Sequence, residues 1–210
     1  MATNTLKQQL KLILPVSLLI IGISCKGDKK DDTFSENDFE GNSSLSNSNT
    51  IAKSIKLYDA IIKDFVDCKS TAEEDRSLCR NEITKVISEI YSLSEFKNAN
   101  HEYLIYDSIQ PIIRRSKEWE NIGLATNPET LNEALAHTNN GGLSLVIDTS
   151  ESYGHVVMII AGKAKYSGSW EMNLPDVLSL LNYQADKSFY DKSLSYAFKK
   201  SDDLHVYIRH

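Results

Sequence analysis

The prediction of the fold starts from one stretch in the second half of the chain, Gly154-His155-Val156-Val157-Met158-Ile159-Ile160. It is nearly continuous in apolar residues, and it follows the turn-prone run 148–154. A short, continuous apolar run of this kind predicts a central strand that is buried on both faces. His155 would then stand at the first position of that strand, where its imidazole can meet a side chain from a facing helix.

The residues before this strand predict helices. Apolar residues recur at three- and four-residue spacing from Ser54 to about Asp67, which predicts an amphipathic helix. After a polar turn, a second expected helix carries an apolar stripe over residues 83–91. Cys79 shares that stripe at the first turn, and Ser77 is the expected N-cap. Further helices are expected over residues 101–116, with Pro111 kinking or restarting the helix, and over 127–139.

The residues around and after the central strand predict a sheet. Short β-like runs cover 143–147, 155–161 and 166–170, and a short helix is expected over 176–181 after Pro175. Two final segments, 193–198 and 204–209, flank a polar turn and predict a hairpin. Helices that precede an antiparallel sheet along the chain predict an α+β domain, with the helices packed on a small antiparallel β-sheet.

The N-terminal residues have the pattern of a lipoprotein signal peptide. Lys7 and Lys11 precede an apolar stretch over 12–23, which is shorter than the roughly 20 residues of a membrane span. Gly22-Ile23-Ser24-Cys25 is similar to a relaxed bacterial lipobox. The expectation is a signal peptide over 1–24, diacylated Cys25, a flexible tether over 25–50 and one domain over 51–210. The alternative is an ordinary secretory signal in which the cysteine occurs by chance.

Charge and residue spacing exclude several classes of function. Removal of residues 1–24 takes away two lysines and no acidic residue, which changes the formal net charge from −6 to −8. A chain this acidic is not expected to bind nucleic acid. No set of His, Cys, Asp and Glu residues has the spacing of a metal site, so neither a metal nor a cofactor is expected.

Two cysteines remain in the domain, and they allow two readings. A thiolate is the reactive form of cysteine, and a helix N-terminus or a neighbouring imidazolium lowers the thiol pKa. Cys79 at a helix start and His155 at a strand start could therefore form a nucleophile–base pair. In an oxidising cell envelope, however, Cys68 and Cys79 could equally form a disulfide, because they lie 11 residues apart. Both readings stay open at this point.

The chain resembles the NlpC/P60-like and CHAP-like cysteine peptidases and amidases of bacterial cell walls, which have a papain-like fold. The resemblance covers roughly residues 78–209. It is carried by Cys79-Arg80-Asn81-Glu82-Ile83, Trp119-Glu120-Asn121-Ile122-Gly123, the Gly154-His155-Val156 strand and Ser167-Gly168-Ser169-Trp170. It implies that Cys79 is the nucleophile and His155 the general base of a lipid-anchored hydrolase that cleaves peptide or amide bonds in peptidoglycan.

The chain departs from the family pattern in two respects. Arg80 follows the cysteine where a small or aromatic residue is more usual, and no recognisable motif supplies the third residue that orients the imidazole. Ser169 and Glu171 are the candidates for that role. The alternative function is therefore a non-catalytic surface lipoprotein, or an inactive relative of the same fold. It would act as a binding module with a Cys68–Cys79 disulfide.

Overall fold

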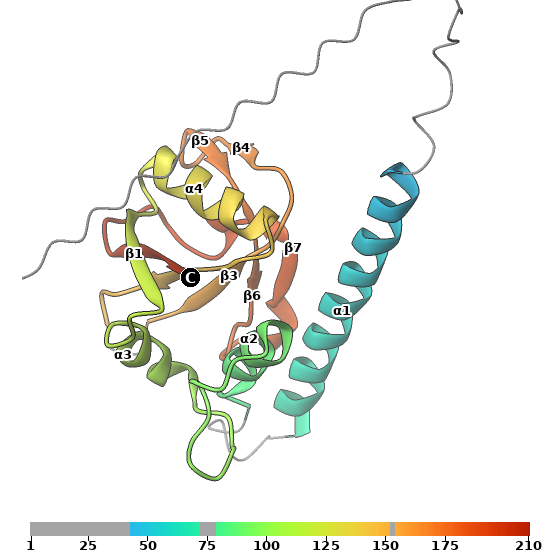
Figure 1. Cartoon of the computed structure of the whole chain (residues 1–210), viewed down its shortest axis with the longest axis vertical. Helices are drawn as coiled ribbons and strands as arrows, with labels where there is room; N and C mark the ends of the chain where they lie inside the picture. The colour runs from blue at the N-terminus through green and yellow to red at the C-terminus, as the bar shows by residue number, and fades with distance from the viewer. Residues whose placement is uncertain (1–42, 72–78, 152–153) are drawn as a thin grey trace, which may run out of the picture. The chain divides into compact units, whose positions relative to one another are not determined.

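The computed structural model describes residues 43–71, 79–151 and 154–210, and it describes the side chains of the first helix from residue 56 onward (Figure 1). The expected signal peptide, Cys25, most of the tether and Ser77 lie outside the described residues. The helices are α1 (Ser43–Thr71), α2 (Glu82–Tyr91), α3 (Ile109–Ile113) and α4 (Pro128–Asn139), with short 3-10 turns η1 (Tyr106–Ser108), η2 (Ala185–Lys187) and η3 (Leu194–Tyr196). The strands are β1 (Trp119–Leu124), β2 (Leu143–Asp148), β3 (Val156–Ile159), β4 (Lys165–Ser167), β5 (Met172–Leu174), β6 (Asp176–Ser179), β7 (Phe189–Ser193) and β8 (Leu204–Arg209).

Six of these strands form one antiparallel sheet in the order β1-β8-β2-β3-β6-β7, and β4 pairs with β5 in a separate hairpin. The strand predicted from the Gly-His-Val stretch is β3, which lies inside this sheet between β2 and β6. All four of its residues are buried. Helices packed on an antiparallel sheet confirm the predicted α+β class.

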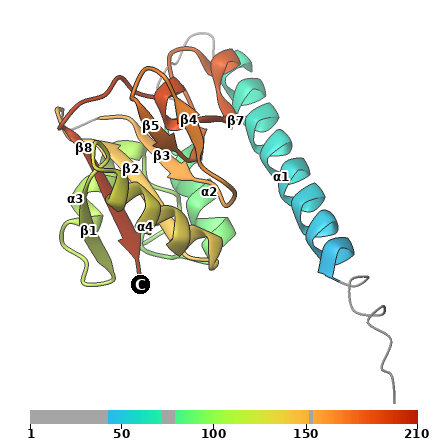
Figure 2. The ribbon, with the colours of Figure 1, turned by 90° about the horizontal axis from the view of Figure 1, so that it is seen from above.

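Both faces of the sheet are covered by a hydrophobic core. Successive side chains of a strand point to opposite faces, so each strand contributes to both cores. Val156 and Met158 of β3 belong to the core on the side of α2 and α3, whereas Val157 and Ile159 belong to the core on the side of α4. Figures 1 and 2 show α4 lying across its face of the sheet. Burial on both faces explains why β3 is continuous in apolar residues.

Helix α1 begins earlier than the sequence predicts. It starts at Ser43, so residues 43–50, which composition assigned to the flexible tether, are helical. Its later half contacts the sheet: the rings of Tyr58 and Tyr190 stack with centroids 5.4 Å apart, and the Tyr190 hydroxyl donates to Asp59 at 2.9 Å. Phe65 is 1% exposed within the same core as α2.

Several of the predicted elements are wrong. The expected helix over 101–116 shrinks to η1 and α3, and the expected short helix over 176–181 is instead strand β6. The expected terminal hairpin is absent from the described residues, since β8 pairs with β1 and β2 while residues 194–196 form η3. Short apolar runs do not separate helix from strand by periodicity alone. Pairing with neighbouring strands of the sheet accounts for β6 and for the position of β8.

Candidate functional site

Gly154 and His155 sit where the end of β2 comes very close to the start of β3. The Asp148 amide donates to the His155 carbonyl at 3.0 Å. A Cβ atom placed on Gly154 would lie 1.8 Å from the Asp148 carbonyl oxygen, so no larger residue fits there without a backbone shift. The close approach fixes the backbone immediately before His155. The glycine in the Gly-His pair is therefore a steric requirement.

The imidazole of His155 is held by a neighbouring strand. Its Nε2 is hydrogen-bonded to Oγ of Ser179 at 2.8 Å, and its ring centroid lies 5.4 Å from that of Phe198. Ser179 belongs to β6 and is 0% exposed. Ser179 is not recognisable as a partner from the sequence, because residues 176–181 are expected there to form a helix. Of the two residues expected to orient the imidazole, Ser169 is hydrogen-bonded to Ser167 instead.

Burial lowers the pKa of His155 to about 4, and the charge of Asp148, which acts in the opposite direction, does not offset this. The imidazole is therefore neutral at neutral pH. A neutral imidazole carries one N–H donor and one acceptor nitrogen. It cannot act as an imidazolium that lowers a neighbouring thiol pKa.

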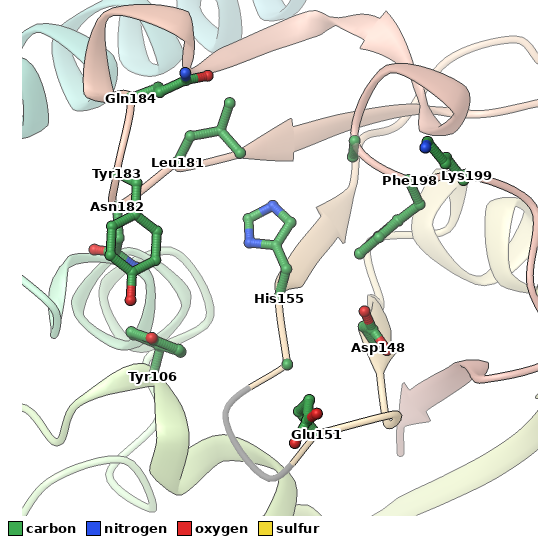
Figure 3. A pocket seen from close by; sticks show the side chains of 12 residues that line it. Tyr106, Asp148, Glu151, His155, Leu181, Asn182, Tyr183, Gln184, Phe198 and Lys199 are labelled. Carbon is green, nitrogen blue, oxygen red and sulfur yellow. The ribbon is translucent and has the colours of Figure 1, made fainter.

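His155 lies in a pocket of about 510 Å³, here called the histidine pocket. Figure 3 shows the imidazole in the middle of the lining side chains, with Leu181 and Tyr183 on one side and Phe198 on the other. Charged groups also line it. The full lining consists of Tyr106, Asp148, Glu151, Gly154, His155, Leu181, Asn182, Tyr183, Gln184, Ala197, Phe198 and Lys199.

Cys79 forms a disulfide with Cys68, with their Cα atoms 6.2 Å apart, a separation typical of disulfides. The prediction of a free Cys79 nucleophile is therefore corrected. A sulfur in a disulfide carries no thiolate to attack a carbonyl. The alternative that the sequence left open, a Cys68–Cys79 bond, is the one present. Cys79 also precedes α2 rather than opening it, and it has a left-handed backbone with φ of 67°.

The disulfide is connected to one wall of the histidine pocket. The Arg80 carbonyl, one residue after Cys79, accepts a hydrogen bond from the Tyr106 amide at 3.0 Å. The Arg80 guanidinium also pairs with Asp107 at 2.6 Å and lies 5.0 Å from the centre of the Tyr106 ring. Tyr106 lines the pocket. The bond to Cys68 thus joins the end of α1 to the segment that positions this wall.

The described residues give no sign of a metal or of a membrane-crossing helix. Within 43–71, 79–151 and 154–210, no group of three or more His, Cys, Asp or Glu side chains could hold a metal ion. Over the same ranges, every helix is too short or too polar to traverse a bilayer.

A scan against protein-family models finds no match, and a search of curated proteins finds none either.

Proposed function

We propose that this chain is a lipid-anchored, non-catalytic binding module with a papain-like (NlpC/P60-type) arrangement, and that its histidine pocket binds peptides of the cell envelope. The observation that carries the proposal is the Cys68–Cys79 disulfide beside an open pocket. A pocket built around a histidine, in a chain whose candidate sulfur is bonded to another cysteine, is suited to binding without bond cleavage.

The lining of the pocket supports binding over covalent catalysis. Among the described residues that line it, none carries a thiol or an aliphatic hydroxyl. Ser179, which touches the imidazole, is 0% exposed, so its hydroxyl cannot reach a bound ligand. Covalent catalysis needs a nucleophile that a substrate can approach, and the described lining offers no serine or cysteine for that role.

The chemistry of the lining fits a peptide. Tyr106, Tyr183 and Phe198 provide aromatic surface, which suits the apolar groups of a ligand. Asp148 and Glu151 suit an ammonium group, and Lys199 suits a carboxylate. A peptide carries apolar groups, amides and both kinds of charge in one molecule. The neutral His155 imidazole adds one donor or acceptor for an amide.

Tyr183 offers the cleanest test, because it is 86% exposed and its removal leaves the core unchanged. We expect sugar-free stem peptides of peptidoglycan to bind saturably in isothermal titration calorimetry. Tyr183→Ala should weaken that binding by about 5- to 10-fold, since tyrosine is enriched among the interface residues whose truncation costs more than about 1 kcal/mol. Tyr166→Ala, which removes a tyrosine that is 70% exposed outside this pocket, is the matched control and should leave the affinity unchanged.

The same samples separate binding from hydrolysis. Mass spectra of the stem peptides after prolonged incubation should be unchanged. Cleavage that disappears in Cys79→Ala would contradict the proposal and favour the cysteine hydrolase. Stem peptides that do not bind at all would contradict the proposal as well.

We also propose that Cys25 carries the lipid that anchors the chain to the bacterial cell envelope. Support comes from the basic residues, the short apolar stretch and the small residues before Cys25. Cys25→Ala should move the protein from the membrane fraction to the soluble fraction, as followed by immunoblot. Unchanged membrane fractionation of that variant would argue against the anchor.

A further inference from the structure

A second, smaller pocket lies beside β4 and the end of β7, whose positions can be followed in Figure 2. Its volume is about 340 Å³, and it is here called the serine pocket. Two segments far apart in the sequence form it: one supplies residues 166–169, and the other supplies Ser193, Ser195 and Tyr196. The next residues along the chain, 197–199, belong to the lining of the histidine pocket instead. The two pockets share no lining residue.

Four serine hydroxyls in the serine pocket form one chain of hydrogen bonds. Ser169 and Ser167 are 3.1 Å apart at their Oγ atoms. Ser167 donates to Ser195 at 3.1 Å, and Ser195 and Ser193 are 3.0 Å apart. The bond between Ser167 and Ser195 crosses between the two segments, and the other two bonds extend the chain within each segment, so the hydroxyls are held in place before any ligand arrives. A preorganised polar group loses less entropy on binding than a mobile one.

The hydroxyl chain has more free acceptors than free donors. Each hydroxyl has one donor hydrogen and two acceptor lone pairs. Three bonds among four hydroxyls use all but one of the donors, and most of the lone pairs stay free. The matching ligand therefore offers several O–H or N–H donors. An anion such as phosphate offers mainly acceptors, and the described residues that line this pocket include no charged side chain to hold one.

Two tyrosines flank the hydroxyls. Tyr166 and Tyr196 are 70% and 69% exposed, although large aromatic rings are usually buried more deeply than this. The Tyr196 ring is oriented by Phe189, whose centroid lies 6.4 Å away, and by the Lys192 ammonium, 5.8 Å from the ring centre. An aromatic face packs well against the C–H face of a sugar ring, whose hydroxyls point outward around its edge.

From these observations we infer that the serine pocket binds a neutral saccharide. The tyrosine rings pack against the sugar face, and the serine lone pairs accept hydrogen bonds from its hydroxyls. A peptide fits less well, because the lining holds no charged side chain and little apolar surface besides the tyrosines. The inference is independent of the peptide proposal, since it depends on a separate pocket with its own residues.

The test uses the full chain and defined, uncharged tetrasaccharides of N-acetylglucosamine, of glucose and of mannose, titrated by calorimetry. At least one should bind saturably, and Tyr166→Ala should weaken it by fivefold or more. Ser195→Ala should weaken it as well, because it breaks the hydroxyl chain at a middle position. Tyr183→Ala in the histidine pocket is the matched control, and its saccharide affinity should equal that of the wild type.

The inference is overturned if none of the three tetrasaccharides binds, or if binding is the same in Tyr166→Ala and Ser195→Ala as in the wild type. Inorganic phosphate that binds in the pocket in their place would also overturn it. Tyr166 is largely exposed, so its variant should fold normally even if Ser195→Ala does not. Because the stem peptides carry no sugar and the tetrasaccharides no peptide, failure of one proposal is distinguishable from failure of the other.

Discussion

The double variant Cys68→Ala/Cys79→Ala is expected to unfold with a free energy about 2–4 kcal/mol lower than the wild type. The disulfide closes a short loop, since the two cysteines are 11 residues apart, and crosslinks of this kind stabilise mainly by restricting the unfolded chain. It also joins the end of α1 to the segment before α2. Urea unfolding followed by circular dichroism, under oxidising conditions, measures the difference.

Reduced wild-type protein is the control for this prediction. With a reductant present, the wild type should lose the same stability as the double variant, and the variant itself should not respond. Equal stability of variant and wild type under oxidising conditions would show that the bond does not hold these segments together in solution.

Acid is expected to destabilise the protein through His155. Its pKa is about 4 in the folded chain and about 6.5 in the unfolded chain, so the unfolded state binds the proton more readily. The full contribution of His155 to the free energy of unfolding is therefore present above pH 6.5, and it is lost as the pH falls toward 4. The loss from this one group is about 2 kcal/mol at pH 5 and about 3 kcal/mol near pH 4.

Urea unfolding at pH 7.5 and pH 5 checks this prediction when the wild type is compared with His155→Gln. Glutamine can keep a hydrogen bond to Ser179 but does not titrate, so the variant lacks this part of the pH dependence. Other titrating groups affect both proteins equally. If the free energy of unfolding changes by the same amount between pH 7.5 and pH 5 in the wild type and in the variant, His155 is not desolvated as described.

The sequence was most informative where a pattern had only one structural solution. The continuous apolar run of β3 required burial on both faces of a sheet, and Asn127-Pro128 marked the start of α4 through the asparagine cap and the proline at the first turn. The β6 segment had no such constraint. Its four residues form a strand because β3 and β7 pair with them from either side.

The candidate site was predicted in part for the same reason. His155 could be singled out because it directly precedes a recognisable strand, which begins at Val156, and Gly154 before it is required by the Asp148 carbonyl. Ser179 could not be found, because its role depends on the pairing of β6 with β3. The two cysteines allowed either a nucleophile or a disulfide, and only the arrangement of α1 beside α2 decides between them. The serine pocket had no local signal, since its two halves meet only in the folded chain.

The proposed binding without cleavage depends most directly on the bond between the sulfur of Cys79 and that of Cys68. Alkylation of the native protein without reductant, followed by proteolysis and peptide mass mapping, tests this directly. We expect a linked peptide pair containing Cys68 and Cys79, with alkylation at both sites only after reduction. Alkylation of both cysteines in the unreduced protein would contradict it and make Cys79 available as a nucleophile.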